Sequence, residues 1–180
     1  NRRTFINPAQ IGIVNVTASS LAIGNAEDIV DLQAPARRVW TQDVPASWIC
    51  IDLIDWAIKP TGYSLRHGGD YRADALRNWD FQGSNNGKTW QLLKRHSDDP
   101  SLDGPHAIHT WSVVGAIEPY TSFRIIQTGQ NSNNHNFLVV AGIELFGEVW
   151  EWSTKGDQRK DKSTRKDGQK RRAQTTRTTK

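Results

Sequence analysis

The stretch with the most obvious chemical potential runs over residues 63–79, YSLRHGGDYRADALRNW. It combines Arg66 and Arg72 with Asp70 and Asp74, and a carboxylate beside an arginine could act as an acid–base pair. The same residues could instead form ion pairs that order a loop. We favour ion pairing, because the sequence has no GxSxG or HExxH motif and no glycine-rich loop that precedes a helix. The sequence therefore predicts a protein without a catalytic site.

Side chains that could bind a metal ion are sparse. His106 and His109 are three residues apart, a spacing that serves metals on helices, but here the pair spans a loop and the start of a predicted strand. His96, with the aspartates that follow it, is interpreted as loop polarity with a hydrogen bond at a strand end. Cys50 is the single cysteine, which excludes a cysteine-based zinc site and an internal disulfide. We expect neither a metal nor a cofactor.

Two connections carry side chains that are suited to binding. Arginine presents a planar donor fork to carboxylate, sulfate or phosphate, tyrosine offers a stacking surface, and asparagine both donates and accepts hydrogen bonds. The candidate ligand-binding residues are His67, Tyr71, Arg72, Arg77, Asn131, Asn134 and His135. For Arg66 and Arg77 an alternative stays open, in which they bridge neighbouring strands and contact no ligand.

Alternation of apolar and polar residues predicts about eight strands, separated by turns rich in Gly, Pro, Asn and Asp. Residues 24–32 favour one short helix, with Asn25 as its N-cap and Asp28 three positions later. Because strands and helices do not alternate, we expect an all-β fold, an eight-stranded antiparallel jelly-roll sandwich. The predicted strands cover residues 11–19, 47–54, 60–67, 78–84, 88–96, 109–114, 122–129 and 136–149.

The long connections between these strands should gather at one end of the sandwich. If each strand reverses the direction of the one before it, the connections after the first, third, fifth and seventh strands share one end. These are residues 20–47, 67–77, 97–108 and 130–135, while the tight Ser-Asn-Asn-Gly hairpin falls at the other end. Long polar loops on a rigid scaffold are frequent recognition sites. We therefore expect a ligand at the end where they meet.

The aromatic residues divide into two groups. Trp79, Phe81, Trp90, Phe123 and Phe146 follow strand patterns, and we expect them in the core because aromatic rings bury large areas. Trp150 and Trp152 follow the last strand and could either fold back on the sandwich or contact a partner.

The C-terminal tail differs sharply from the rest of the chain. Residues 151–180 contain 11 Lys and Arg against 4 Asp and Glu, a net charge of +7, whereas residues 1–150 carry −3. We therefore expect a domain at 1–150 and a disordered basic low-complexity tail at 151–180. Lys170, Arg171 and Arg172 could contact nucleic acid or an acidic protein surface, or serve nuclear import; the alternative is a solvated linker.

The cellular setting is only weakly indicated. A single cysteine, expected to be a small buried hydrophobe, favours a reducing intracellular environment, cytoplasmic or nuclear. No apolar run approaches membrane-spanning length, and no signal peptide is visible. The chain has no methionine, even at position 1, so we expect an internal fragment or a processed product.

Longer motifs add a family resemblance over residues 7–149. SWICIDL, the YSLRHGGDYRADALRNWDFQGSNNGKTWQLLKRHSDD run, FRIIQTGQNS and LVVAGIELFGEV resemble the discoidin (F5/8 type C), galactose-binding-like domains. The similarity is strongest to the intracellular branch found in a HECT-type E3 ubiquitin ligase and in BTB-domain adaptor proteins. WxFxGSxxGxxW and GxELFG are specific in combination and weak alone. The cysteine pair of secreted members is absent, and no acidic cluster matches a calcium site.

The resemblance implies an eight-stranded jelly roll that recognises a ligand through loops at one end, without catalysis. Our first hypothesis is accordingly a recognition module that binds a protein segment, an anionic group or a glycan, as an arm of a larger intracellular protein such as a ubiquitin ligase. The alternative is a structural subunit of a ribonucleoprotein or cytoskeletal assembly, anchored by the basic tail. A glycan-active enzyme or its carbohydrate module ranks last, because most tryptophans are expected to be internal.

Overall fold

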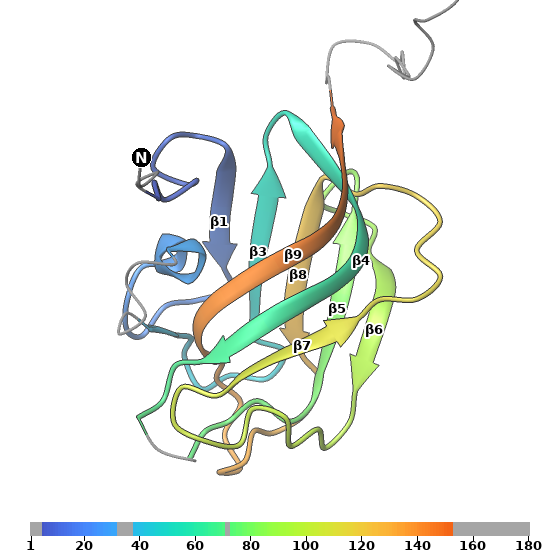
Figure 1. Ribbon diagram of the computed structural model, residues 1–180. Coiled ribbons are helices and arrows are strands. Elements are labelled where there is room, and N and C mark those ends of the chain that lie inside the picture. Colours follow the sequence, from blue (N-terminus) through green and yellow to red (C-terminus); the bar gives the residue numbers. More distant parts are fainter. Residues whose placement is uncertain (1–4, 32–37, 71–72, 153–180) are drawn as a thin grey trace, which may run out of the picture.

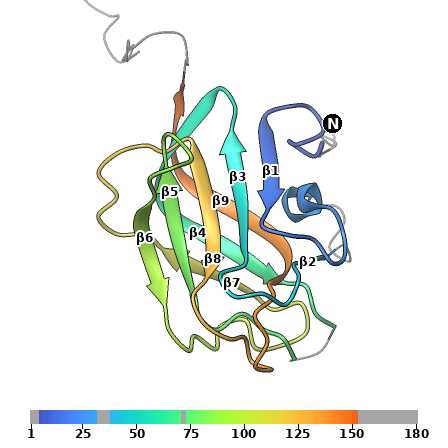
Figure 2. The same cartoon turned by 180° about the vertical axis from the view of Figure 1, so that it is seen from behind.

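Two antiparallel β-sheets pack face to face in a computed structural model that describes residues 5–31, 38–70 and 73–152 (Figures 1 and 2). The larger sheet has the order β1 (Val14–Ala18), β3 (Trp48–Leu53), β8 (Ser122–Gln127), β5 (Trp79–Ser84) and β6 (Gln91–His96). The smaller has the order β2 (Val39–Trp40), β9 (Val139–Glu151), β4 (Trp56–His67) and β7 (Ile108–Ser112). The prediction of an all-β antiparallel sandwich is confirmed.

Two details differ from the sequence prediction. The described residues form nine strands, because β2 is a two-residue strand with too short a pattern to be seen in sequence. The predicted helix at 24–32 is one turn of 3₁₀-helix, η1 (Ala26–Val30). Its expected N-terminal contact is present, since the backbone N–H of Asn25 donates to the Asp28 carboxylate at 3.3 Å.

The core lies between the sheets and follows the alternation of the strands. In β3, Ile49, Ile51 and Leu53 lie on one face of the strand and are buried in the core. Tyr63 of β4 stacks on Phe81 of β5 with ring centroids 4.0 Å apart, so aromatic rings join the two layers.

Three of the five aromatic residues expected in the core are there: Trp79, Phe81 and Phe123. The prediction was wrong for Phe146, which is 42% exposed, and for Trp90, which is only half-buried. Phe146 follows Leu145, which packs against the core, so its side chain lies on the outer face of the smaller sheet. Trp90 packs over the outer face of the larger sheet, with the guanidinium of Arg124 4.2 Å from the centre of its ring. Trp150, left open by the sequence, is 43% exposed.

Close packing and hairpin geometry explain the small and polar residues of the WDFQGSNNG motif. Gly83 lies under the Tyr120 ring, and a Cβ there would approach the ring to 2.7 Å. The Ser84 hydroxyl accepts the backbone N–H of Asn86 and donates to Thr89 O, which closes the hairpin. Gly87 has a φ of +64°, the left-handed conformation that glycine adopts without strain.

The four long connections do meet at one end, at the bottom of Figure 1, and the 85–90 hairpin lies at the other. Backbone hydrogen bonds tie neighbouring connections together, for example Ser132 N to Ala75 O and Asp99 N to Arg77 O, both at 2.9 Å. The predicted convergence is therefore correct, and we call this end the rim. Its described residues belong to segments 38–47, 68–70, 73–78, 97–107 and 128–138.

Candidate functional site: the loop rim

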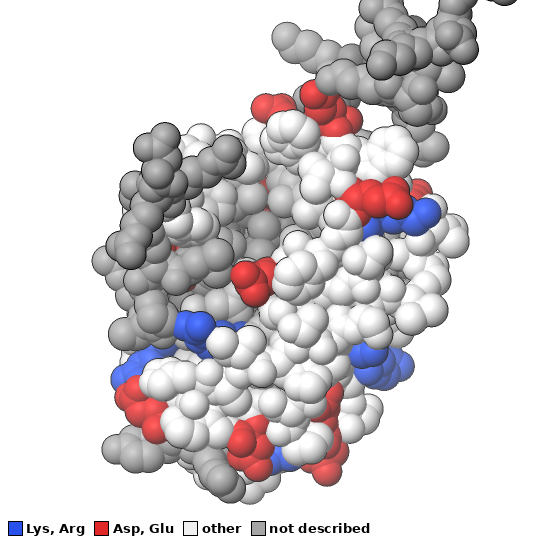
Figure 3. Space-filling model, in the orientation of Figure 1, with Lys and Arg blue, Asp and Glu red and all other residues white. Residues whose placement is uncertain are grey.

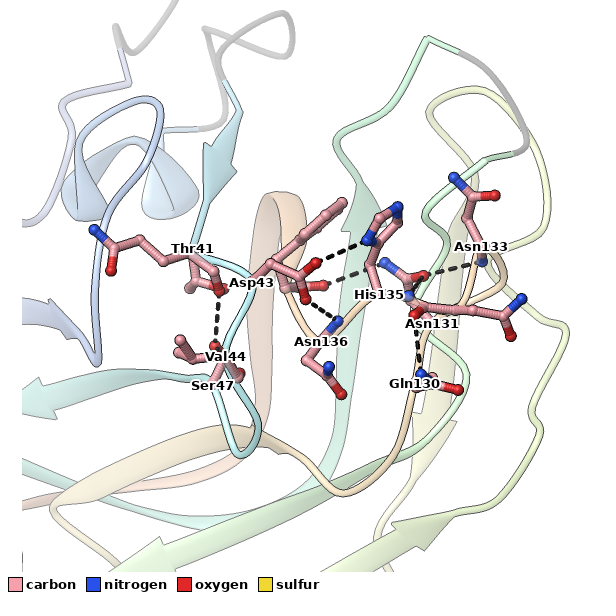
Figure 4. Close-up of polar contacts among 12 residues, drawn as sticks. Thr41, Asp43, Val44, Ser47, Gln130, Asn131, Asn133, His135 and Asn136 are labelled. Atoms are coloured by element: carbon pink, nitrogen blue, oxygen red, sulfur yellow. Dashed lines mark hydrogen bonds and ion pairs between the residues drawn. The ribbon is translucent and has the colours of Figure 1, made fainter.

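A carboxylate clamp joins two connections of the rim (Figure 4). Asp43 accepts the Nδ1–H of His135 at 2.8 Å and the backbone N–H of Asn136 at 2.7 Å. These bonds, the Asn136 backbone bond first and then His135, hold the pKa of Asp43 below its usual value. An ionised carboxylate thus fixes the ring of His135, one of the predicted site residues, at the partly exposed surface.

Asn131 builds the loop that carries His135. It is buried, and its Oδ1 accepts the backbone N–H groups of Asn133 and His135 at 2.9 and 3.0 Å. Its Nδ2 donates to Phe137 O at 3.4 Å. Both ends of the amide are therefore engaged inside the connection, which places this predicted site residue in a positioning role.

A polar hollow of about 450 Å³ lies beside that loop. Asn134 reaches it from a left-handed backbone conformation, φ +61°, and its carbonyl accepts the Gln130 side-chain amide at 3.0 Å. The side chains around the hollow are mostly amides, which can pair with either donors or acceptors. They are Arg77, Asn78, Asp98, Gln130, Asn131, Ser132 and Asn134.

Arg77 forms the wall of this hollow and is held by its neighbours. Its Nη2 lies 3.2 Å from Asp103 and its Nη1 3.9 Å from Asp98, both in the 97–107 connection. This arrangement matches the alternative left open by the sequence, in which Arg77 joins structural segments. His67 is also internal: it is fully buried at the end of β4, directly beneath Gly69.

Several predicted site residues lie outside the described residues: Tyr71 and Arg72, and the tail residues Lys170, Arg171 and Arg172. Nearby, Asp70 does not pair with Arg66. It bonds the Arg38 guanidinium at 2.6 Å and lies 3.2 Å from Nε2 of His106, so it bridges three separate segments. The Arg38 contact holds the pKa of Asp70 below its usual value.

An aromatic stack crosses the rim, and sequence inspection missed it. Trp40 stacks on Phe137 with centroids 5.2 Å apart, and Phe137 stacks on His135 at 4.8 Å. The Arg38 guanidinium lies 5.8 Å from the centre of the Trp40 ring. All four side chains are partly exposed, and the Nε1–H of Trp40 has no hydrogen-bond partner among the described residues. We call Arg38, Trp40, Phe137 and His135 the rim stack.

A buried polar network lies beneath the rim. Trp79 donates to the Tyr63 hydroxyl at 2.9 Å, and that hydroxyl lies 2.7 Å from His96 Nε2. His96 Nδ1 lies 2.6 Å from Asp99, which also accepts the Nε1–H of Trp111. A neutral imidazole with its proton on Nδ1 satisfies every bond. The expected strand-end hydrogen bond of His96 is thus present.

This His–Asp pair resembles a catalytic dyad only in composition. The His96 side chain is 3% exposed, and the Trp79 ring lies parallel to its imidazole at 3.9 Å. A substrate cannot reach a ring enclosed in this way, so the pair serves structure.

The network predicts acid sensitivity. Burial is the main cause that lowers the pKa of His96 below 6.5, so the folded chain binds this proton less readily than the unfolded chain. The free energy of unfolding should therefore decrease as the pH falls below about 6.5. An NMR titration of the His96 ring should give a midpoint below 6.5, and His96→Gln should flatten the pH dependence of urea unfolding between pH 7 and 5. A midpoint above 6.5 would contradict the burial argument.

Within the described residues, no three His, Cys, Asp or Glu side chains are grouped so that they could hold a metal ion. The helices described there are also too short and polar to cross a membrane.

The arrangement of strands is shared with solved structures. The family 32 carbohydrate-binding module of NanJ from Clostridium perfringens, solved with galactose, superposes with a TM-score of 0.60 and 11% identity, over 77% of this chain and 96% of that one. A fucose-binding module of Streptococcus pneumoniae gives 0.59 and 16%, over 74% and 91%. This chain has a discoidin-like, galactose-binding-like fold. The resemblance predicted from the sequence is confirmed.

The curated relatives of this discoidin-like domain are much larger proteins, and the chain matches only one segment of each. It is 40% identical over 152 residues to E3 ubiquitin-protein ligase Ufd4 of Drosophila melanogaster, and 35% identical over 149 residues to E3 ubiquitin-protein ligase hecd-1 of Caenorhabditis elegans. Each alignment covers 81% of this chain and 6% of the ligase. A BTB/POZ domain-containing protein of Arabidopsis thaliana is 28% identical over 159 residues, 79% of this chain and 19% of that protein. No family model matches the chain.

Proposed function

We propose that this discoidin-like domain is a non-catalytic recognition module of a larger intracellular ubiquitin-ligase protein, and that its rim binds a protein segment. The observation that carries the proposal is the rim stack, which lies beside an amide-rich hollow at the end of a rigid sandwich. Aromatic surface with adjacent amide groups suits a polypeptide backbone, and equally a sugar. The similarity to the two ligases supports the part of the proposal that makes the parent protein a ubiquitin ligase.

The charges of the described rim favour a polar or basic ligand over an anionic one. Arg38 and Arg77 are both engaged by aspartates of the rim itself. Figure 3 shows acidic and basic side chains next to one another at this end, without a basic patch on the face in view. Arginines that already have carboxylate partners have fewer donors to offer an anion. A carboxylate has about four acceptor sites, so the partly exposed Asp43, with two bonds inside the rim, can still accept donors from a partner.

Binding assays with a rim variant test this proposal. Trp40→Leu combined with His135→Gln removes the two rings that stack on Phe137. We expect this variant to bind any specific ligand at least tenfold more weakly, a loss of about 1.4 kcal/mol. The ligand would be sought with arrays of peptides and of glycans, and affinities measured by interferometry on the full chain. The control is Trp150→Leu, at the opposite end of the sandwich.

Three outcomes separate the hypotheses. Peptide binding that is lost in the rim variant and kept in the control supports the proposal. Glycan binding with the same pattern keeps the rim as the site and changes the ligand class. If the rim variant is folded and binds the ligand as tightly as the wild-type chain does, the rim is not the binding site.

A further inference from the structure

A second hollow lies on the outer face of the larger sheet and shares no lining residue with the hollow at the rim. It has a volume of about 230 Å³, and its walls include Trp48, Cys50, Asp52, Trp90 and Arg124. β3 and β8 form its floor, and the hairpin between β5 and β6 brings Trp90 over it; Figure 2 views the molecule from the side of this sheet. We call it the outer hollow.

Arg124 is held in a fixed orientation at the floor of the outer hollow. In the sheet register it lies opposite Cys50. Its Nε–H donates to the Gln82 side-chain oxygen at 2.8 Å, and its guanidinium carbon lies 4.2 Å from the centre of the Trp90 ring. A hydrogen bond along one edge and an indole face together fix the plane of the guanidinium.

No carboxylate of the described residues forms an ion pair with this guanidinium. Arg38, Arg77 and Arg95 each pair with an aspartate, whereas no ion pair to Arg124 occurs among the residues that the structure describes. Arg124 is half-buried, so the cation is partly removed from water, and this burial lowers its pKa. A partly desolvated cation without a counter-charge is stabilised by an anion that binds it.

Thr17 carries no charge, and neither Cys50 nor Asp52, which also line the hollow, forms an ion pair with Arg124. Burial raises the pKa of the Cys50 thiol to about 12, so it stays neutral at physiological pH. Asp52 faces the same hollow but lies opposite Ser122 in the register, two residues along the strand, and its Oδ1 accepts the Cys50 thiol at 3.6 Å.

We propose that the outer hollow binds a carboxylate group of a partner polypeptide, with the free N–H groups of Arg124 as donors and the indoles of Trp48 and Trp90 around its stem. A carboxylate is planar, accepts two parallel bonds from one guanidinium and carries a single charge. A phosphate dianion suits the site less, because one arginine would face two charges with Asp52 nearby. The hollow has room for one side chain or one chain terminus. This site is separate from the rim and does not depend on the function proposed there.

NMR titration of the full chain tests the proposal, with the Nε–H signal of Arg124 and the indole N–H signals of Trp48 and Trp90 as probes. Three peptides would be compared: acetyl-Leu-Glu-Leu-amide, its Gln counterpart, and acetyl-Leu-Leu with a free carboxyl terminus. We expect saturable shifts with the Glu peptide, with the free terminus, or with both, and at least tenfold weaker binding of the Gln peptide. Which carboxylate binds more tightly identifies its source in the partner.

Matched variants determine whether charge at this site is responsible. Arg124→Gln should weaken carboxylate binding at least tenfold, and Asp52→Asn should strengthen it about twofold to fivefold, since it removes a like charge near the ligand. Lys88→Gln is the control, because it removes an exposed positive charge next to Gly87, at the border of the hollow. The proposal is overturned if the Gln and Glu peptides bind equally, or if Asp52→Asn weakens binding. If Arg124→Gln fails to fold, the change in carboxylate affinity of Asp52→Asn still tests the proposal.

Discussion

Replacing Trp79 with alanine should lower the free energy of unfolding by about 4 kcal/mol, the largest effect that we expect from a single substitution in this chain. Trp79 is completely buried, stacks on the His96 ring at 3.9 Å and donates its Nε1–H to the Tyr63 hydroxyl at 2.9 Å. The substitution creates a cavity and also removes the donor that orients that hydroxyl. Urea unfolding at pH 7.5, followed by far-UV circular dichroism, measures the loss.

A second tryptophan provides the matched control. Trp150→Ala removes the same atoms from a side chain that is 43% exposed at the far end of β9. Its effect on unfolding should stay within about 0.5 kcal/mol, as for most surface substitutions. If both variants lose the same free energy, the assignment of Trp79 to the core is mistaken.

Replacing Asp99 with alanine should cost about 3 kcal/mol, because it leaves several buried donors without an acceptor. Its carboxylate accepts His96 Nδ1–H at 2.6 Å, Trp111 Nε1–H at 3.1 Å and the backbone N–H of Ser101 at 2.9 Å. Burial opposes the ionisation of this carboxyl, but the bonds from Ser101 and His96 outweigh it and lower the pKa of Asp99. The stability that Asp99 contributes should therefore be complete above about pH 4 and decrease as the pH falls further.

Asp103→Ala is the control for Asp99→Ala in the same connection. Asp103 forms a partly exposed ion pair with Arg77 at 3.2 Å, and such pairs contribute about 1 kcal/mol or less. Thermal unfolding of both variants at pH 7.5 makes the comparison. A cost for Asp103→Ala that equals or exceeds that of Asp99→Ala would show that the buried network does not anchor the connection.

Local patterns were sufficient for eight of the nine described strands and for the end at which the long loops meet. Alternation in β3 indicates that Ile49, Ile51 and Leu53 share one face, because successive side chains of a strand point to opposite faces, and the structure buries that face in the core. The Asn-Gly pair at 86 and 87 predicted the hairpin, since glycine adopts the positive φ found there. Reversal of direction at each turn then fixed which connections share the rim.

The same patterns failed where coverage by a neighbouring layer decides burial. Phe146 directly follows Leu145, whose side chain packs against the core, so the alternation of β9 turns Phe146 to the outer face of the smaller sheet, where it is 42% exposed. Trp90 lies outside the strands altogether and found its partner in Arg124 of β8. The alternation of a strand shows which residues share a face, and only the packing of the two sheets decides which face is buried.

The candidate site divides in the same way between sequence and tertiary structure. By itself, the sequence determined the sandwich, the direction of its strands and therefore the end where recognition residues gather, because these depend on side-chain alternation and turn conformation. Only the tertiary structure decided which rim side chains are exposed. Asp43 meets His135 and Trp40 meets Phe137 because the short strand β2 pairs with β9, a contact between residues almost a hundred positions apart. No local pattern encodes such a pairing, since it arises from the packing of the whole chain.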